Sequence, residues 1–399
     1  MDNNVINKGR CPFDSGSPVQ IDLFVGRETA VNSILRAIQQ VELGKPQALF
    51  LAGEYGIGKS SLAGYMRVVA ERDHHLLGIH VQLGGARTVE DVAAKTLEAA
   101  INTRAYEPTI TEKIRNIFAR YIGTQSLFGL TINMEVLKAD TPSIAHGYLP
   151  FLRGLCERFK EDKIKGVMLI FDELNGIAAN PDFAYFIKGI VDENALSNDP
   201  LPLLLMLCGV EERRAKMIQC HEPMDRIFKI IDIEPMDKVE MMDFFNKAFG
   251  TVGITIDMKA MEYFCLYGAG LPKVMHVIGE QAFWLDKDNK IDRNDAVMAV
   301  VQAVKEIGRK FVDQQIYKAL RSPAYHSILT MLGEKVFDLS FKKASVEKGL
   351  STDEKKKFNN FLQRMKKLNV LRSGEEMGEY IFTSKMLQLY CCMFPIKKP

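Results

Sequence analysis

The chain has 399 residues, of which 47% are hydrophobic and 26% charged, a composition typical of globular proteins with two or three domains. The longest apolar stretch, residues 201–210, is shorter than the ~20 residues that a membrane-spanning helix needs, and residues 1–10 carry no apolar signal segment, so the sequence predicts a cytoplasmic protein without a membrane partner. The net charge is +2, but residues 335–399 contain fourteen Lys/Arg against seven Asp/Glu, which indicates a basic C-terminal part on a mildly acidic body.

Residues 1–20 are rich in Asn, Gly, Pro and Ser and are predicted to form an extended lead-in. A helix is expected after the sequence Phe24-Val25-Gly26-Arg27-Glu28, because apolar residues recur at helical spacing between positions 31 and 41. Gly44-Lys45-Pro46 is expected to end this helix.

Short apolar runs alternate with helical stretches over the next 190 residues or so, and this pattern predicts an α/β fold with a parallel sheet covered by helices on both faces. The predicted strands are residues 48–52, 76–83, 167–171, 203–208 and 228–233, and helices are expected at 60–71 and 89–101. Residues 103–148 are predicted to be an insertion that contains a helix and an alternating, hairpin-like stretch at 127–137. The insertion is either a partner-binding element or an extension packed on the sheet edge.

The first predicted strand leads into Gly53-Glu54-Tyr55-Gly56-Ile57-Gly58-Lys59-Ser60, which fits the pattern G-x-x-x-x-G-K-[ST]. In such a P-loop the glycines allow backbone N–H groups to point at phosphate oxygens. Lys59 can reach the β- and γ-phosphates, Ser60 can ligate Mg²⁺, and the helix that carries Ser61 adds its positive end. The sequence therefore predicts a site for ATP and Mg²⁺.

The third predicted strand ends in Asp172 and Glu173, at the edge of the sheet where ligands bind in open α/β folds. Asp172 is expected to hold the Mg²⁺ shell, and Glu173 to orient the attacking water as the catalytic carboxylate. Alone, the pair could equally be an acidic helix cap, but it follows a complete P-loop.

Arg226 precedes the last predicted strand and is a candidate arginine finger reaching a neighbouring subunit; the alternative is a surface arginine paired with Asp225 or Glu222. Arg213 and Arg214 are weaker candidates for the same role. Lys273, in Gly270-Leu271-Pro272-Lys273, could reach the γ-phosphate from a bundle of helices predicted over residues 238–304, or could be a solvent-exposed lysine at a helix start with Pro272 at the first position.

Three helices and a hairpin are predicted at the C-terminus, which is the outline of a winged helix. The helices are expected at 324–332, at 342–348 and after the capping box Ser351-Thr352-Asp353-Glu354, and the hairpin strands at 369–372 and 380–383. Basic side chains surround the apolar face of the third helix and are candidate contacts to duplex DNA: Lys355, Lys356, Lys357, Arg364 and Lys367. Such lysines are often only solvated, and acidic residues at the turn of the hairpin would repel phosphate.

These motifs, in this order, resemble P-loop ATPases of the AAA+/STAND kind. The sequence at 24–28, the P-loop and Phe171-Asp172-Glu173-Leu174 are similar to archaeal-type ATPases and origin-recognition-type initiators. Three further segments are similar to ATPases that regulate DNA transposition: residues 204–212, Asp225-Arg226 and Ile233-Glu234-Pro235-Met236. The resemblance spans about residues 20–305, more loosely the winged helix, and implies that Val25, Gly26 and Arg27 contact the adenine and that Pro272 and Lys273 belong to a lid over the nucleotide. Two departures from the family favour a slow switch over a motor: Cys208-Gly209 at the end of the fourth strand, where many members have Asn, Ser or Thr, and Lys273 where Arg is commoner.

The resulting domain prediction is a lead-in at 1–20, a P-loop ATPase domain at 21–235, a helical lid at 236–305 and a winged helix at 306–399. The first functional hypothesis is a DNA-associated ATPase switch, an initiator, loader or transposition regulator, that forms homo-oligomers with ATP. The second is a signalling or defence ATPase of the STAND kind that acts through a partner protein without DNA. A small-molecule kinase with the same P-loop is a third option that the lid and winged helix disfavour.

Overall fold

The computed structural model describes residues 8–14, 16, 24–101, 141–307, 322–335, 340–368, 370–374, 376–383 and 385–393. Most of the predicted insertion, including the hairpin-like stretch at 127–137, lies outside the described residues. The chain divides into two compact units, one formed by Pro18–Glu234 and the other by Met1–Ser17 together with Pro235–Pro399. No helix among the described segments is long and apolar enough to cross a membrane.

A five-stranded parallel sheet with the order β2-β3-β4-β1-β5 forms the centre of the first unit. Its strands are β1 (Gln47–Ala52), β2 (Leu76–Gln82), β3 (Gly166–Asp172), β4 (Leu203–Gly209) and β5 (Lys229–Asp232). The five predicted strands are confirmed, and each strand end differs from its predicted position by at most one residue. Every residue of β3 and β4 is buried, as expected for central strands covered on both faces.

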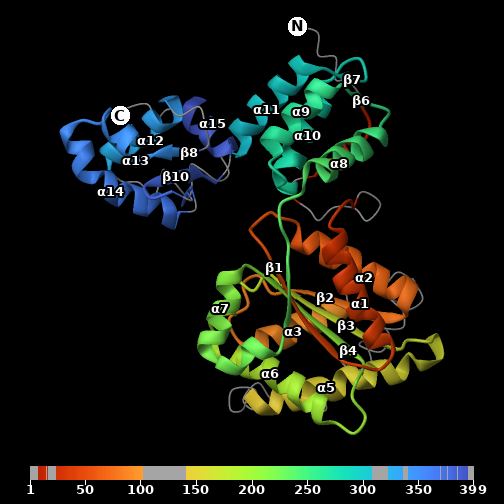
Figure 1. Ribbon diagram of the computed structural model, residues 1–399. Helices are drawn as coiled ribbons and strands as arrows, with labels where there is room; N and C mark the ends of the chain where they lie inside the picture. The colour runs from red at the N-terminus through yellow and green to blue at the C-terminus, as the bar shows by residue number, and fades with distance from the viewer. Residues whose placement is uncertain are drawn as a thin grey trace. The chain divides into compact units, whose positions relative to one another are not determined.

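Helices cover both faces of this sheet, with α1 and α2 on one face and α3, α5 and α6 on the other (Figure 1). The helices and short 3₁₀ turns of the first unit are α1 (Glu28–Glu42), α2 (Lys59–His74), α3 (Val89–Ile101), α5 (Thr141–Arg158), η2 (Lys160–Asp162), α6 (Pro181–Leu196), α7 (Glu211–Cys220) and η3 (Glu222–Arg226). The predicted helices at 31–41, 60–71 and 89–101 correspond to α1, α2 and α3.

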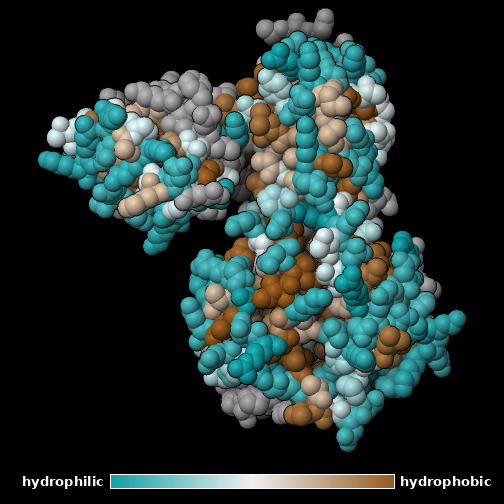
Figure 2. Space-filling view, in the orientation of Figure 1, coloured by the Kyte–Doolittle hydropathy of each residue, from teal (hydrophilic) through white to brown (hydrophobic). Residues whose placement is uncertain are grey.

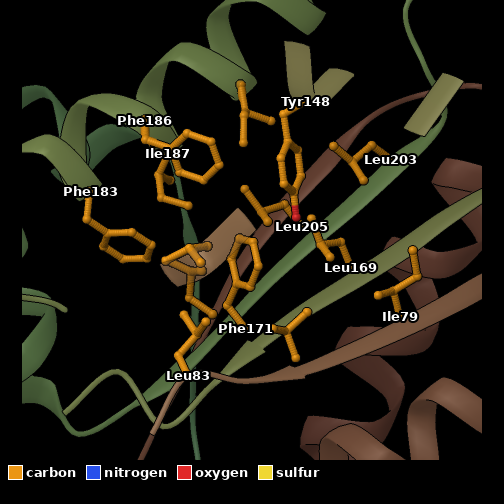
Figure 3. Close-up of a cluster of buried hydrophobic side chains, with 14 of the residues drawn as sticks. Ile79, Leu83, Tyr148, Leu169, Phe171, Phe183, Phe186, Ile187, Leu203 and Leu205 are labelled. Atoms are coloured by element: carbon orange, nitrogen blue, oxygen red, sulfur yellow. The ribbon is translucent and has the colours of Figure 1, made fainter. Parts of the chain in front are cut away.

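The apolar core on the second face fills the space between the sheet and α5 and α6 (Figure 3). Tyr148 of α5 stands among Phe171, Phe186 and Leu205, and its hydroxyl donates to Thr96 Oγ1 at 2.7 Å, so the one polar atom of this ring is satisfied inside the core. Burial raises the pKa of Tyr148 far above its usual range. This core fixes β3, the strand that ends in Asp172.

The second unit begins with four helices, α8 (Lys238–Gly250), α9 (Met258–Gly268), α10 (Pro272–Leu285) and α11 (Arg293–Ile307). The predicted helical stretch at 238–304 is thus confirmed, but two short paired strands that were not predicted, β6 (Thr255–Ile256) and β7 (Lys290–Ile291), interrupt it. Asp237 and Glu240 form a capping box at the start of α8. Gly270 has a φ of 71°, and a Cβ atom there would lie 2.4 Å from the Met236 carbonyl oxygen, so the turn before α10 requires glycine.

The C-terminal part contains α12 (Pro323–Lys335), α13 (Lys343–Glu347), α14 (Thr352–Lys367) and α15 (Lys385–Met393), with strands β8 (Ser340–Lys342), β9 (Leu371–Ser373) and β10 (Glu379–Phe382). The predicted hairpin and the capping box of Ser351 with Glu354 are confirmed. The helix expected from residue 342 begins one residue later, because Lys342 lies in β8, which adds a third antiparallel strand to the hairpin in the order β8-β10-β9. Neither β8 nor α15 was predicted.

Candidate nucleotide-binding site

The P-loop connects β1 to α2, as the motif requires. Gly56 and Gly58 have φ angles of 79° and 100°, a left-handed conformation that side chains with a Cβ atom rarely adopt, and Gly58 is the N-cap of α2. Ile57 is 1% exposed and fixes the loop to the core, whereas the side chains of Glu54 and Tyr55 are exposed. The loop is therefore a tight backbone turn at the N-terminus of a helix, a geometry suited to anions.

Lys59 and Ser60 occupy the first two positions of α2, followed by Ser61. Lys59 Nζ donates to two carbonyl oxygens of the loop itself, Gly53 O and Glu54 O, each at 2.8 Å. Burial lowers the pKa of Lys59, and the negative charge of Asp172 opposes that shift. The ammonium group thus lies inside the turn, between the loop backbone and the end of β3.

Asp172 is 3% exposed and is surrounded by hydrogen-bond donors. The backbone N–H of Glu173 donates to Asp172 Oδ1 at 2.8 Å, and His80 Nε2 lies 3.2 Å from Oδ2. Burial alone would raise the pKa of Asp172, but hydrogen bonds from His80 and from the Ser60 hydroxyl outweigh it and hold the pKa below its usual value. Ser60 and Asp172, predicted from separate motifs, are therefore in direct contact.

Two polar residues of this cluster were not predicted. His80 and Gln82 lie on β2 on the same side of the strand, and the register places Gln82 opposite Asp172. Gln82 Nε2 is 3.5 Å from Asp172 Oδ2. The available signal was the pair of polar residues two positions apart at the end of an otherwise apolar strand, which places both beside the end of the neighbouring strand.

Glu173 differs from its neighbour in being exposed and in having a φ of 61°, a left-handed conformation that is uncommon outside glycine. Its carboxylate lies over Gly84 in the loop after β2, because a Cβ atom at Gly84 would come within 2.5 Å of Glu173 Oε2. The backbone turn at the end of β3 thus directs two adjacent carboxylates to different places.

Cys208, at the end of β4, is completely buried. Burial and the nearby charge of Asp172 raise the pKa of its thiol well above the usual value. A neutral thiol therefore occupies this position, where many of the ATPases that the sequence resembles have a polar side chain.

The segment before α1 packs directly on the P-loop and α2. The ring of Phe24 stacks on that of Tyr65 with centroids 4.4 Å apart, and Arg27 Nη2 donates to Ile57 O at 3.0 Å. Gly26 and Arg27 both have positive φ, at 72° and 65°. Arg27 therefore contacts the P-loop, and Val25 and Gly26 come directly before it in the chain; the contact of these three residues with adenine stays a prediction.

Among the candidate fingers, Arg226 is exposed at the end of η3 and has no hydrogen bond or ion pair with any described residue. Asp225, its expected surface partner, instead binds Arg214 at 2.9 Å, and Arg214 also binds Glu211. Arg213 Nε is buried with no partner in the described part of the chain. The expected surface pair of Arg226 with Asp225 or Glu222 is thus absent among these residues.

The remaining predicted residues belong to the second unit. Pro272 is the first residue of α10 and Lys273 lies in its first turn. On α14, Lys355, Lys356 and Lys367 are exposed and Arg364 is half-buried, while Lys357 is paired with Asp353 at 2.9 Å.

Comparison with known proteins agrees with this geometry. Residues 23–217 match the family of AAA ATPase domains. No curated protein matches the sequence significantly. Among solved structures, the chain is similar to a Walker-type ATPase of Pyrococcus abyssi, with a TM-score of 0.56 and 17% identity over 95% of this chain and 99% of that one. It is also similar to the ORC2 protein of Aeropyrum pernix in its ADPNP–ADP complexes, with a TM-score of 0.60 and 12% identity over 96% of this chain and 97% of that one.

At 17% and 12% identity, the two solved structures show the fold alone. The family match covers the segment that contains the P-loop, the acidic pair and four of the five strands. Residues 23–217 thus form a domain of the AAA ATPase family, and the P-loop and the acidic pair lie within it.

Proposed function

We propose that the chain is a slow Mg-ATP switch that associates with duplex DNA, of the initiator, loader or transposition-regulator type. The observation that carries the nucleotide part is the cluster of Lys59, Ser60 and Asp172 at the carboxyl edge of the sheet, with the P-loop backbone beside it. The relative from Aeropyrum pernix was solved with ADPNP and ADP, which supports a nucleotide at the equivalent place here.

Mg²⁺ fits the residues of this cluster. Magnesium prefers oxygen ligands and takes one or two carboxylates with phosphate oxygens and water, so Asp172 and the Ser60 hydroxyl are sufficient protein donors. The bound ion would neutralise charge that develops on the phosphates. Lys59 would exchange its two carbonyl acceptors for phosphate oxygens, and Glu173 would orient the attacking water.

Slow turnover and assembly with other copies are part of the same proposal. Cys208 places a thiol, which is only a weak hydrogen-bonding group, beside Asp172 and Lys59, so β4 supplies no strong hydrogen-bonding side chain that could help position a water. Arg226, exposed and without a described partner, is available to a neighbouring copy of the chain as an arginine finger. Lys273 would act from the lid.

The DNA part rests on α14 and its surroundings. Phe358, Phe361, Leu362 and Met365 bury one side of this helix, and Lys356 and Lys367 lie on the opposite side by helical spacing. The surface over α14 is mostly hydrophilic (Figure 2). Helices α12 to α14 with the sheet β8-β10-β9 support a winged helix in which α14 is the recognition helix.

The test is binding of the full chain to labelled duplex DNA with a slowly hydrolysed ATP analogue, with ADP or without nucleotide, at two salt concentrations. We expect nucleotide-dependent binding that weakens steeply with salt, because phosphate contacts release counterions. The variant Lys355→Glu/Lys356→Glu/Lys367→Glu should lose this binding.

The matched control makes the same charge change on exposed lysines of the helical bundle, Lys238→Glu/Lys259→Glu/Lys287→Glu. It should bind DNA much more tightly than the α14 variant. Absence of binding in every nucleotide state, or equal losses in the two triple variants, would contradict a DNA-binding role for α14.

A further inference from the structure

Residues 8–14, here called the N-terminal strap, pack on the helical bundle of the second unit (Figure 1). Phe13 is 3% exposed, and its ring centroid lies 4.6 Å from that of Phe249 and 5.9 Å from that of Phe244, both on α8. Gly279 on α10 leaves the necessary room, because a Cβ atom there would come within 2.4 Å of the Phe13 ring. The groove between α8 and α10 is therefore shaped for a phenylalanine side chain.

Polar contacts fix the strap on either side of Phe13. Lys8 Nζ donates to Phe283 O at 2.8 Å and to Asp286 Oδ2 at 2.7 Å, and the Asp286 side chain is 0% exposed. The backbone N–H of Asp14 donates to His276 Nδ1 at 3.2 Å. Removal of one partner of a buried ion pair leaves the other charge uncompensated. Lys8 therefore both holds the strap on the bundle and compensates the buried charge of Asp286.

The course of the chain gives these contacts a consequence for the nucleotide site. After the strap the chain enters the first unit, Pro18–Glu234, here called the ATPase unit, and it returns to the second unit at Pro235. Gly16 still belongs to the strap side, because its backbone N–H donates to Asp14 Oδ1 at 2.8 Å. The next described residue on this path is Phe24, which stacks on Tyr65 just before the segment Val25–Arg27. The proposed adenine contacts thus lie at the end of a second covalent connection between the two units. The packing of Phe13 on α8 anchors one end of this connection, and the stacking of Phe24 on Tyr65 anchors the other.

We propose that the strap controls nucleotide retention: with Phe13 in the α8–α10 groove, the segment before the P-loop is restrained and binds nucleotide with a small loss of conformational entropy. When the strap leaves the groove, that segment gains freedom, and nucleotide dissociates faster. This inference rests on the proposed nucleotide site. It adds the α8–α10 groove as a regulatory docking site, with the chain's own residues 8–14 as its occupant.

The test compares two variants of the full chain that displace the strap from the groove in different ways. Phe13→Ala removes the side chain that fills it, and Gly279→Ala fills it from α10 while improving helix propensity, so the second variant is expected to fold even if the first is unstable. Gly250→Ala is the control, since Gly250 ends α8 in the same unit and has open space around its Cβ position. Dissociation of a fluorescent ADP is followed after addition of excess unlabelled ADP.

We expect dissociation at least threefold faster in Phe13→Ala and Gly279→Ala, and unchanged in Gly250→Ala. Release of the strap is measured separately by alkylation of Cys11, quantified on its peptide by mass spectrometry. Cys11 is half-buried beside Phe13, and burial raises the pKa of its thiol, so it should react slowly in the parent chain and faster in the two strap variants.

The possible outcomes distinguish a failure of this inference from a failure of the proposed function. A parent chain that retains no ADP would contradict both the nucleotide site and the role of the strap. If the parent retains ADP and Cys11 becomes reactive in the variants while ADP dissociates at the parental rate, the nucleotide site stands and the coupling is wrong. Equal Cys11 reactivity in all four proteins would show that the strap does not occupy the groove.

Discussion

At the scale of single residues, Asp172 and Glu173 are sequence neighbours with different surroundings. Asp172 is buried among donors, which include the Glu173 backbone N–H, whereas the Glu173 carboxylate is exposed and lies over Gly84. Glu173→Gln should therefore leave nucleotide affinity within about twofold and lower the hydrolysis rate about 10²-fold or more, because only the carboxylate can polarise water. Phosphate release and nucleotide affinity are measured on the same preparation. Hydrolysis at the parental rate in Glu173→Gln would remove Glu173 from the mechanism.

His80 provides a second prediction at this scale. Its Nε2 lies 3.2 Å from Asp172 Oδ2 and orients the carboxylate that we propose for the magnesium shell. Loss of such an orienting partner typically weakens metal sites 10–100-fold, so His80→Ala should raise the Mg²⁺ concentration for half-maximal activity about tenfold. His80→Asn, which retains a donor, should recover part of the loss. Gln82→Ala is the control, because the contact of Gln82 with Asp172 is longer, at 3.5 Å, and Gln82 itself is exposed.

His276 makes the stability of the second unit depend on pH. Burial lowers its pKa from 6.5 to about 4, although the charge of Asp14 opposes the shift. Between pH 6.5 and 4 the unfolded chain binds a proton that the folded chain does not, so stability falls as the pH drops through this window. We expect a loss of about 2 kcal/mol between pH 7.5 and 5.

Urea unfolding of the parent chain and of His276→Gln at the two pH values measures this contribution. Glutamine retains an acceptor for the Asp14 N–H but does not titrate, so the variant should lose about 2 kcal/mol less than the parent over the same interval. Equal pH dependence in the two proteins would mean that His276 contributes nothing to it.

At the scale of elements, α14 depends on its N-terminal cap. The Ser351 hydroxyl accepts from the Glu354 N–H, and the Glu354 carboxylate accepts from the Ser351 N–H at 2.8 Å. Ser351→Ala should cost about 1 kcal/mol and lower the DNA affinity of the α14 surface by destabilising that helix. Thr352→Ala, one residue further into the helix, is the control and should change stability by less than about half as much. The check is thermal unfolding together with the DNA-binding assay.

Elements with a strong local signal could be predicted from the sequence. The strands β1 to β4 are mainly apolar runs next to turn residues, and the P-loop and the acidic pair occur at the ends of β1 and β3, so the candidate nucleotide site followed from motif and context. The capping box of α14 is likewise a local pattern within four residues.

Elements that exist only through distant contacts could not be predicted. The strand β8 has three residues, and its hydrogen bonds come from β10, almost forty residues later. The sheet order and the register that place His80 beside Asp172 are also tertiary properties, absent from any local pattern. Lys8 and Asp286 are 278 residues apart, and a polar, glycine-containing lead-in gives no sign of a buried phenylalanine within it.

At the scale of the whole molecule, the first seventeen residues belong to the unit that otherwise begins at Pro235, although the sequence of the entire ATPase unit separates the two segments. The strap is therefore part of the core of that unit. Deletion of residues 1–17 removes Phe13 from its groove and leaves the Asp286 carboxylate without Lys8. Emptying a buried phenylalanine site alone typically costs about 3–5 kcal/mol.

Calorimetry of the parent chain and of the deletion variant, both without nucleotide, should show which unit loses this stability. In the parent chain, the transition of the ATPase unit is identified by its upward shift with Mg-ADP, since a ligand stabilises the unit that binds it. The deletion should lower the midpoint of the other transition by at least about 5 °C and leave the ATPase transition unchanged. Among their described partners, Phe13 and Lys8 contact only residues of the second unit. If the deletion instead lowers the midpoint of the ATPase transition, or changes neither midpoint, the strap does not stabilise the second unit.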